Sequence, residues 1–224
     1  MNPYAVLAAA AALWDRISDR IDPPLRDRLA ALLGIVRGRG GDEATRRDAA
    51  DRAAGLLRER LPDEFGAGGE ARLTLEAMPE AETENEDVGY GGFRFEDLAV
   101  LLIDGHRMVG PVLGPVRERL LAAPALDADT VLRHGGNPFA PELIRLPGVG
   151  GLPRLPRFQF SEDAMPWLIV LEVNTLLAAD RDPWGAADWW LSENAWLGAP
   201  PACLLGAGRD RQLVDTARFL MEGD

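Results

Sequence analysis

The chain has 224 residues, of which 47% are hydrophobic and 27% charged, and its formal net charge is -12 at pH 7. This composition is ordinary for a globular protein of one large domain or two small ones. The negative charge disfavours nucleic-acid binding unless a local basic patch is present. A single cysteine, Cys203, leaves no partner for an internal disulfide. No signal peptide or membrane-spanning segment is predicted, so we expect a cytoplasmic protein with no membrane contact.

Residues 1–65 contain three stretches with apolar residues at helical spacing. They run from Val6 to Ile21, from Leu25 to Val36 and from Ala49 to Leu61. Asp42 is well placed to cap the third stretch. The pattern predicts an N-terminal helical bundle, and the apolar stripes would equally suit a helical dimerisation arm and a homo-oligomer.

Residues 66–134 form a region of mixed character. Alternating residues from Leu73 to Ala77 would suit a short strand, and the acidic tract at 79–92 is typical of a solvated loop. Helices are predicted over Phe95–Ile103 and over Leu126–Arg133, the latter capped by Asp127.

Residues 135–157 are rich in proline, glycine and arginine and are predicted to form a linker. Arginines at 133, 145, 154 and 157 make this stretch locally basic. It is therefore where an acidic partner or a nucleic acid could dock, although a simple tether is the more economical interpretation.

Residues 158–224 hold five of the six tryptophans, which lie between Trp167 and Trp196. An almost wholly apolar stretch from Met165 to Ala179 predicts a buried helix. Asp182–Pro183 is a typical helix start, and the tryptophan-rich helix that follows is expected to end at Gly198. A final amphipathic helix is predicted from near Arg209. The overall prediction is a mainly α protein with a compact C-terminal helical module.

The order of these features resembles the C-terminal toxin-binding domain of the Xre/MbcA/ParS-type antitoxins. The resemblance rests on Phe158–Phe160, the apolar helix, Asn194–Gly198 at the end of the tryptophan-rich helix, Pro201 with Leu204–Gly206, and a last amphipathic helix. It covers about the last third of the chain, and the helix-turn-helix that the family commonly carries is not found in residues 1–157. In that family the domain binds a RES-domain toxin that degrades NAD, and its C-terminal end obstructs the toxin's active site.

The resemblance assigns the site residues to two groups. One group would form the module's own scaffold: Phe158, Phe160, Asp182, Pro183, Trp184, Trp190, Asn194, Leu197, Pro201, Leu204 and Leu205. The other would face the partner: Trp189, Trp196, Arg209, Arg211, Arg218, Met221, Glu222 and Asp224.

An enzymatic function is not predicted. The two histidines, His106 and His134, have no local catalytic context, and Cys203 is expected to be a small buried side chain. No metal-ligand spacing or phosphate-binding motif occurs, and no cofactor is expected. We therefore expect an antitoxin-like protein that binds another protein. A non-catalytic scaffold that reuses the module for another partner is the alternative, and a DNA-binding regulator is the third.

Overall fold

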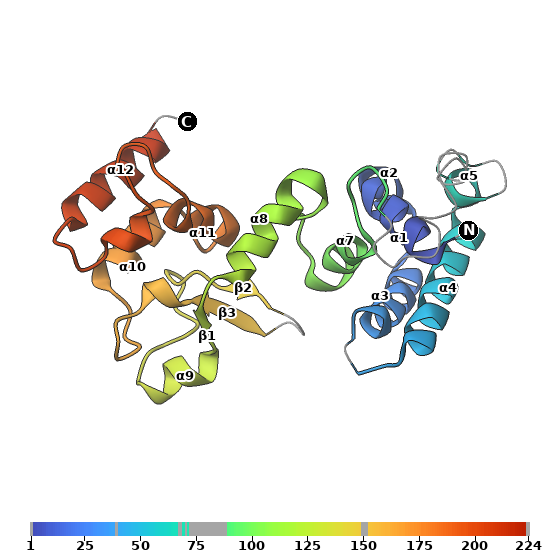
Figure 1. Ribbon diagram of the computed structural model, residues 1–224, viewed down its shortest axis with the longest axis horizontal. Coiled ribbons are helices and arrows are strands. Elements are labelled where there is room, and N and C mark those ends of the chain that lie inside the picture. Colours follow the sequence, from blue (N-terminus) through green and yellow to red (C-terminus); the bar gives the residue numbers. More distant parts are fainter. Residues whose placement is uncertain are drawn as a thin grey trace. The chain divides into compact units, whose positions relative to one another are not determined.

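The computed structural model describes residues 2–38, 40–66, 69, 71, 89–148 and 152–222. These residues form helices and one small three-stranded sheet (Figure 1), which confirms the predicted mainly α fold. They divide into two compact units, residues 1–115 and residues 116–224. The possible strand at Leu73–Ala77 and residues 79–88 of the acidic tract lie outside the described residues.

The first unit is helical in the residues described. Its elements are α1 (Pro3–Ala12), α2 (Trp14–Ile17), the 3-10 turn η1 (Ser18–Arg20), α3 (Pro23–Arg37), α4 (Glu43–Arg60), α5 (Pro62–Phe65), α7 (Phe95–Ala99) and the π-helical turn η3 (Val100–Asp104).

Helix α1 is buried on nearly every side, which differs from the amphipathic helix predicted from Val6 to Ile21. Ala8, Ala9 and Ala10 have no exposed surface, and the helix packs against α4 and α7. Methyl side chains allow neighbouring helices to approach closely, so an alanine-rich helix can lie inside a core. The helix also ends earlier than predicted, at Ala12.

Helices α3 and α4 have the apolar stripes that the sequence predicts. Leu29 and Leu33 of α3 and Ala53 and Leu57 of α4 are fully buried in the core that surrounds α1. The stripes of both helices are thus packed inside the unit. Asp42 caps α4 as predicted, because its carboxylate accepts a hydrogen bond from the Thr45 backbone N–H at 2.7 Å.

The cap of α4 is expected to make stability depend on pH. Hydrogen bonds from the backbone and then the side chain of Thr45 lower the pKa of Asp42 below its ordinary value of 3.8. A lowered pKa in the folded state stabilises the fold above the ordinary pKa, and that stabilisation is lost as the pH falls through the lowered value. We expect Asp42→Ala to lower Tm by a few degrees at neutral pH, and the difference from wild type to shrink as the pH falls from about 5 to about 2.

The measurement is thermal denaturation followed by circular dichroism across that pH range. Asp27→Ala, a change of an exposed residue within α3, is the control and should leave Tm nearly unchanged. A Tm difference for Asp42→Ala that stayed constant with pH would contradict the capping argument.

Helix α8 (Gly110–Ala122) crosses the boundary between the units, and it continues through Pro115. The elements of the second unit that follow it are β1 (Ala125–Leu126), α9 (Ala128–Arg133), β2 (Leu146–Pro147), β3 (Pro153–Pro156), the 3-10 turn η5 (Arg157–Gln159), α10 (Leu168–Leu176), α11 (Pro183–Leu191), the 3-10 turn η6 (Pro201–Leu204) and α12 (Asp210–Glu222).

Much of the predicted linker belongs to the interior of the second unit. Strand β3 lies between β1 and β2 and pairs antiparallel with both, with Leu155 opposite Leu126 and Arg154 opposite Leu146. Leu143 and Leu155 are buried. The proline content suggested a tether, but two prolines stand at the ends of β3, where they interrupt the ladder least.

A buried polar network joins this sheet region to α10 and α11. Asn174 of α10 accepts a hydrogen bond from the Trp190 indole N–H at 2.8 Å and donates one to the Glu142 carbonyl at 2.7 Å. The Asn174 amide also donates to the side-chain oxygen of Gln159, which accepts from the Ile144 backbone N–H at 2.7 Å. Gln159, Asn174 and Trp190 have no exposed surface. Every member is paired, so the network holds α11 in a fixed position against α10 and the sheet region.

Candidate functional site

The tryptophans of the second unit divide into buried and exposed ones. Trp190 is fully buried and Trp184 is 8% exposed. Trp189 is half-buried and packs edge-on against Trp190, with ring centroids 5.0 Å apart. Trp196, by contrast, is 61% exposed. A large ring left in solvent while its neighbours fill the core marks Trp196 as the candidate contact residue.

A tight turn holds Trp196 on the surface. Helix α11 ends at Leu191, before the predicted end at Gly198. The Asn194 side chain then accepts hydrogen bonds from the backbone N–H groups of Trp196 and Leu197, at 3.0 and 3.2 Å. Leu197 points into the core. Asparagine is well suited to such a turn, and the turn directs adjacent side chains to opposite sides, one inward and one outward.

Helix α12 supplies the second exposed ring. Its inner face, with Leu213 and Ala217, is fully buried, and the helix lies against α10 (Figure 1). Phe219 is 62% exposed. It meets Trp196 edge to face, with ring centroids 5.2 Å apart and planes at 86°. Aromatic rings attract one another in this geometry, so the two rings hold each other in place although both face solvent.

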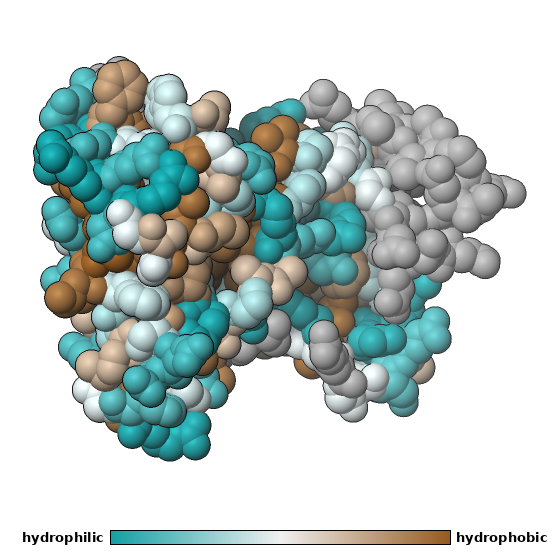
Figure 2. Space-filling model, turned by 60° about the vertical axis from the view of Figure 1, so that its left-hand side comes forward, coloured by the Kyte–Doolittle hydropathy of each residue, from teal (hydrophilic) through white to brown (hydrophobic). Residues whose placement is uncertain are grey.

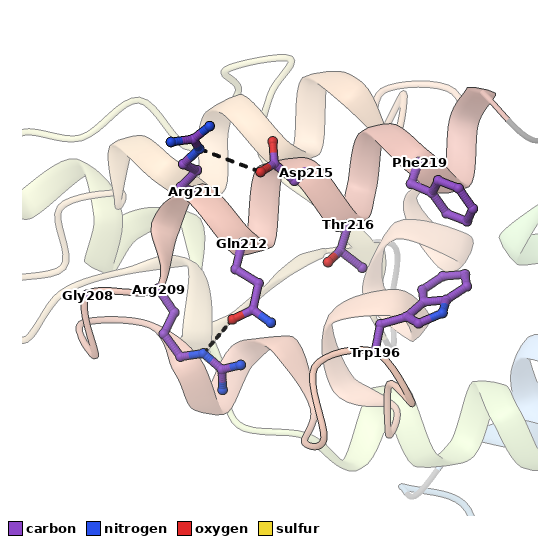
Figure 3. A pocket seen from close by; sticks show the side chains of 8 residues that line it. All are labelled: Trp196, Gly208, Arg209, Arg211, Gln212, Asp215, Thr216 and Phe219. Carbon is purple, nitrogen blue, oxygen red and sulfur yellow. Dashed lines mark hydrogen bonds and ion pairs between the residues drawn. The ribbon is translucent and has the colours of Figure 1, made fainter.

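These rings stand at one end of a groove of about 620 Å³ along α12. Figure 3 shows the rings together at that end, with Arg209 toward the other. Apolar side chains also appear among polar ones on the face of the second unit in Figure 2. The groove is lined by Trp196, Gly208, Arg209, Arg211, Gln212, Asp215, Thr216 and Phe219.

Two guanidinium groups lie along the groove and are held differently. Arg209 donates to the side-chain oxygen of Gln212 at 2.8 Å, and its terminal nitrogens lie within 3.5 Å of the Leu197 carbonyl. Arg211 is 3.7 Å from Asp215, one turn along the helix, and both side chains are well exposed. A solvent-exposed pair of this kind is weak, so Arg211 is available to another carboxylate.

The groove brings together three of the residues predicted to face a partner: Trp196, Arg209 and Arg211. Arg218, Met221 and Glu222 are exposed on α12 but do not line the groove. Trp189 packs on Trp190, and Asp224 lies outside the described residues.

The residues predicted as scaffold are placed as follows. Phe158 is half-buried and contacts Trp190, with ring centroids 5.3 Å apart, and Leu205 is half-buried. Asp182 caps α11 through the Gly185 N–H at 2.9 Å, with Pro183 as the first helical residue. Asn194 forms the turn described above. Buried members are Phe160, Trp184, Trp190, Leu197, Pro201 and Leu204.

Five lining residues were not predicted from the sequence: Gly208, Gln212, Asp215, Thr216 and Phe219. Phe219 had a detectable signal. It stands on the polar side of an otherwise regular amphipathic helix, and a lone large apolar residue in that position is often part of a contact surface.

The arginines of residues 133–157 have structural partners. Each guanidinium donates a hydrogen bond to a backbone carbonyl within the second unit, which stabilises the local loops. The acceptors for Arg133, Arg145, Arg154 and Arg157 are the carbonyl oxygens of Asp129, Ala140, Ala123 and Phe160, in that order.

Among the residues described, no cluster of metal-binding or nucleophilic side chains forms another candidate site. No group of three His, Cys, Asp or Glu side chains there could hold a metal ion. Cys203 is exposed, which corrects the expectation that it is buried; its neighbour Leu204 fills the core instead. No helix in the described part of the chain is both long and apolar enough to span a bilayer.

Comparison of the chain with models of protein families, with curated proteins and with solved structures finds no match.

Proposed function

We propose that this chain is an antitoxin-like protein whose second unit binds a RES-type, NAD-degrading toxin and occludes its active site. The observation that carries the proposal is the exposed Trp196–Phe219 pair beside the groove on the last helix. Tryptophan and arginine are the residues most enriched at the centres of protein interfaces, and both line this groove.

The scaffold around the groove supports a rigid docking surface. The indole of Trp190 is fixed by the buried network, and Asn194 holds the turn that presents Trp196. Preorganised side chains lose little conformational entropy when a partner binds, which favours affinity. The resemblance to the toxin-binding domain supplies the identity of the partner.

The second candidate is a non-catalytic adaptor that uses the same surface for a different protein. The exposed rings favour it equally, since they specify a protein contact but not which protein. A DNA-binding regulator is less well supported, because the arginines of residues 133–157 are bonded to backbone carbonyls and the net charge is -12.

The proposal is tested by co-expressing the full chain with RES-domain proteins from the same genome in a bacterial host. Growth and the cellular NAD level are measured. We expect the intact chain to restore both for its cognate toxin. The double change Trp196→Ala, Phe219→Ala should weaken toxin binding by about tenfold or more and reduce protection, because both rings are lost from the interface.

Phe139→Ala is the matched control, since Phe139 is as exposed as Phe219, at 62%. It should leave protection unchanged. Failure of the intact chain to bind or to neutralise any of these RES-domain proteins would reject the antitoxin proposal. Capture of an unrelated protein that depends on Trp196 would favour the adaptor.

A further inference from the structure

The two ends of the α12 groove differ in chemistry. The rings of Trp196 and Phe219 form an apolar end, and the guanidinium of Arg209 marks the charged end (Figure 3). Gln212 and Thr216 lie between them on the same helix. An occupant that fits both ends must present a large apolar group and a hydrogen-bond acceptor together.

The charge of the lining has the opposite sign from that of the chain. Arg209 and Arg211 are two cations beside one carboxylate, Asp215, whereas the whole chain has a formal net charge of -12. The lining thus carries one net positive charge, two arginines against one aspartate, on a chain that is acidic as a whole. Complementary charges guide association and select the partner, so the lining favours an acidic occupant.

The hydrogen bonds of the two arginines also suit a carboxylate. Arg209 is held in place by the Gln212 side chain and the Leu197 carbonyl, and a guanidinium has five N–H donors, so donors are left over for a ligand. Arg211 contacts Asp215 only through a solvent-exposed pair at 3.7 Å. A partner carboxylate can pair with this guanidinium at little cost.

We infer that the groove receives a short acidic segment of the partner protein, with a large apolar side chain against Trp196 and Phe219 and carboxylates paired with Arg209 and Arg211. The inference requires one part of the proposed function, namely that the second unit binds a protein. The inference holds for a RES-type toxin and for any other protein partner. A nucleic acid would also bring negative charge, but Asp215 and the acidic surface of the chain oppose a continuous phosphate backbone.

The probe is a fluorescein-labelled synthetic peptide of Glu and Asp residues around a central Trp-Leu pair, added to the full-length chain. Binding is measured by fluorescence anisotropy at low and high salt. We expect saturable binding that weakens as salt rises. Trp196→Ala should weaken it by about tenfold or more, and the double change Arg209→Gln, Arg211→Gln should weaken it and flatten the salt dependence.

Two control variants and two control peptides make the result decisive. Phe139→Ala and Arg181→Gln change exposed residues that do not line the groove, and both should bind the peptide as wild type does. A peptide with basic residues in place of the acidic ones, and an acidic peptide without the Trp-Leu pair, should bind weakly. Circular dichroism checks that each variant is folded.

The inference is overturned if the acidic peptide does not bind, if the basic peptide binds as tightly, or if Phe139→Ala weakens binding as much as Trp196→Ala. It is also overturned if single-stranded DNA binds more tightly and displaces the peptide. Peptide binding without protection from any RES-domain protein would uphold this inference and reject the proposed function, so the two can fail separately.

Discussion

Asn174→Ala is expected to destabilise the second unit by about 3 kcal/mol or more. The change removes the acceptor for the fully buried Trp190 indole N–H and the donor to the Glu142 carbonyl. Each buried polar group left without a partner costs about 1–3 kcal/mol, and the shortened side chain leaves a small cavity as well. The Gln159 side chain also loses one of its two donors.

The measurement is urea denaturation followed by tryptophan fluorescence, which reports mainly on the second unit because five of the six tryptophans belong to it. Thr175→Ala is the control. Thr175 neighbours Asn174 on α10 and is exposed, and its hydroxyl donates a hydrogen bond to the Leu171 carbonyl one turn earlier. The control should change the free energy of unfolding by well under 1 kcal/mol. Equal effects of the two substitutions would show that the buried network contributes little.

The helix starts could be predicted from the sequence because they are set by local chemistry. Asp42, Asp127 and Asp182 each accept a hydrogen bond from the backbone N–H three residues later, as their positions before a helical stretch indicated. The helix from Phe95 was likewise found, although it widens into a π-helical turn before Gly105.

The features that the sequence did not reveal depend on distant contacts. The residues on either side of Ala9 in the sequence are alanines, so no local pattern marks Ala9 as a central core residue. Its burial becomes evident only from the helices α4 and α7 that pack against α1. The strands at Leu146 and Leu155 are short, and proline at their ends masks the alternation that identifies a strand. Local patterns therefore predicted a linker where pairing with residues 125–126 makes a sheet.

The residues of the groove were likewise predicted only where the local sequence marked them. Trp196 and Arg209 were selected because a resemblance and a high density of tryptophan pointed to this part of the chain. Phe219 was missed, because a helical pattern indicates which face is polar but not which ring from another segment lies beside it. The contact between Trp196 and Phe219 joins residues 23 positions apart. It forms because the Asn194 turn holds Trp196 on the surface and α12, which packs against α10, places Phe219 beside it.

Ala9→Leu is expected to destabilise the first unit by about 2–3 kcal/mol, the second large effect predicted for this chain. Ala9 has no exposed surface and lies in α1, which is packed against α4 and α7. Three additional carbon atoms can be placed there only by separating helices or by forcing side chains from their preferred rotamers. Leucine is a good helix former, so the loss cannot be attributed to helix propensity.

Hydrogen exchange followed by mass spectrometry localises the effect. Peptides from α1, α4 and α7 should lose protection in Ala9→Leu, whereas those from α10 and α11 should exchange as in wild type, because the units have separate cores. Ala31→Leu, the same change at an exposed position of α3, should leave protection unchanged throughout. Unaltered protection of α1 in Ala9→Leu would mean that this core can accommodate a leucine, and that close packing of the alanines does not hold the first unit together.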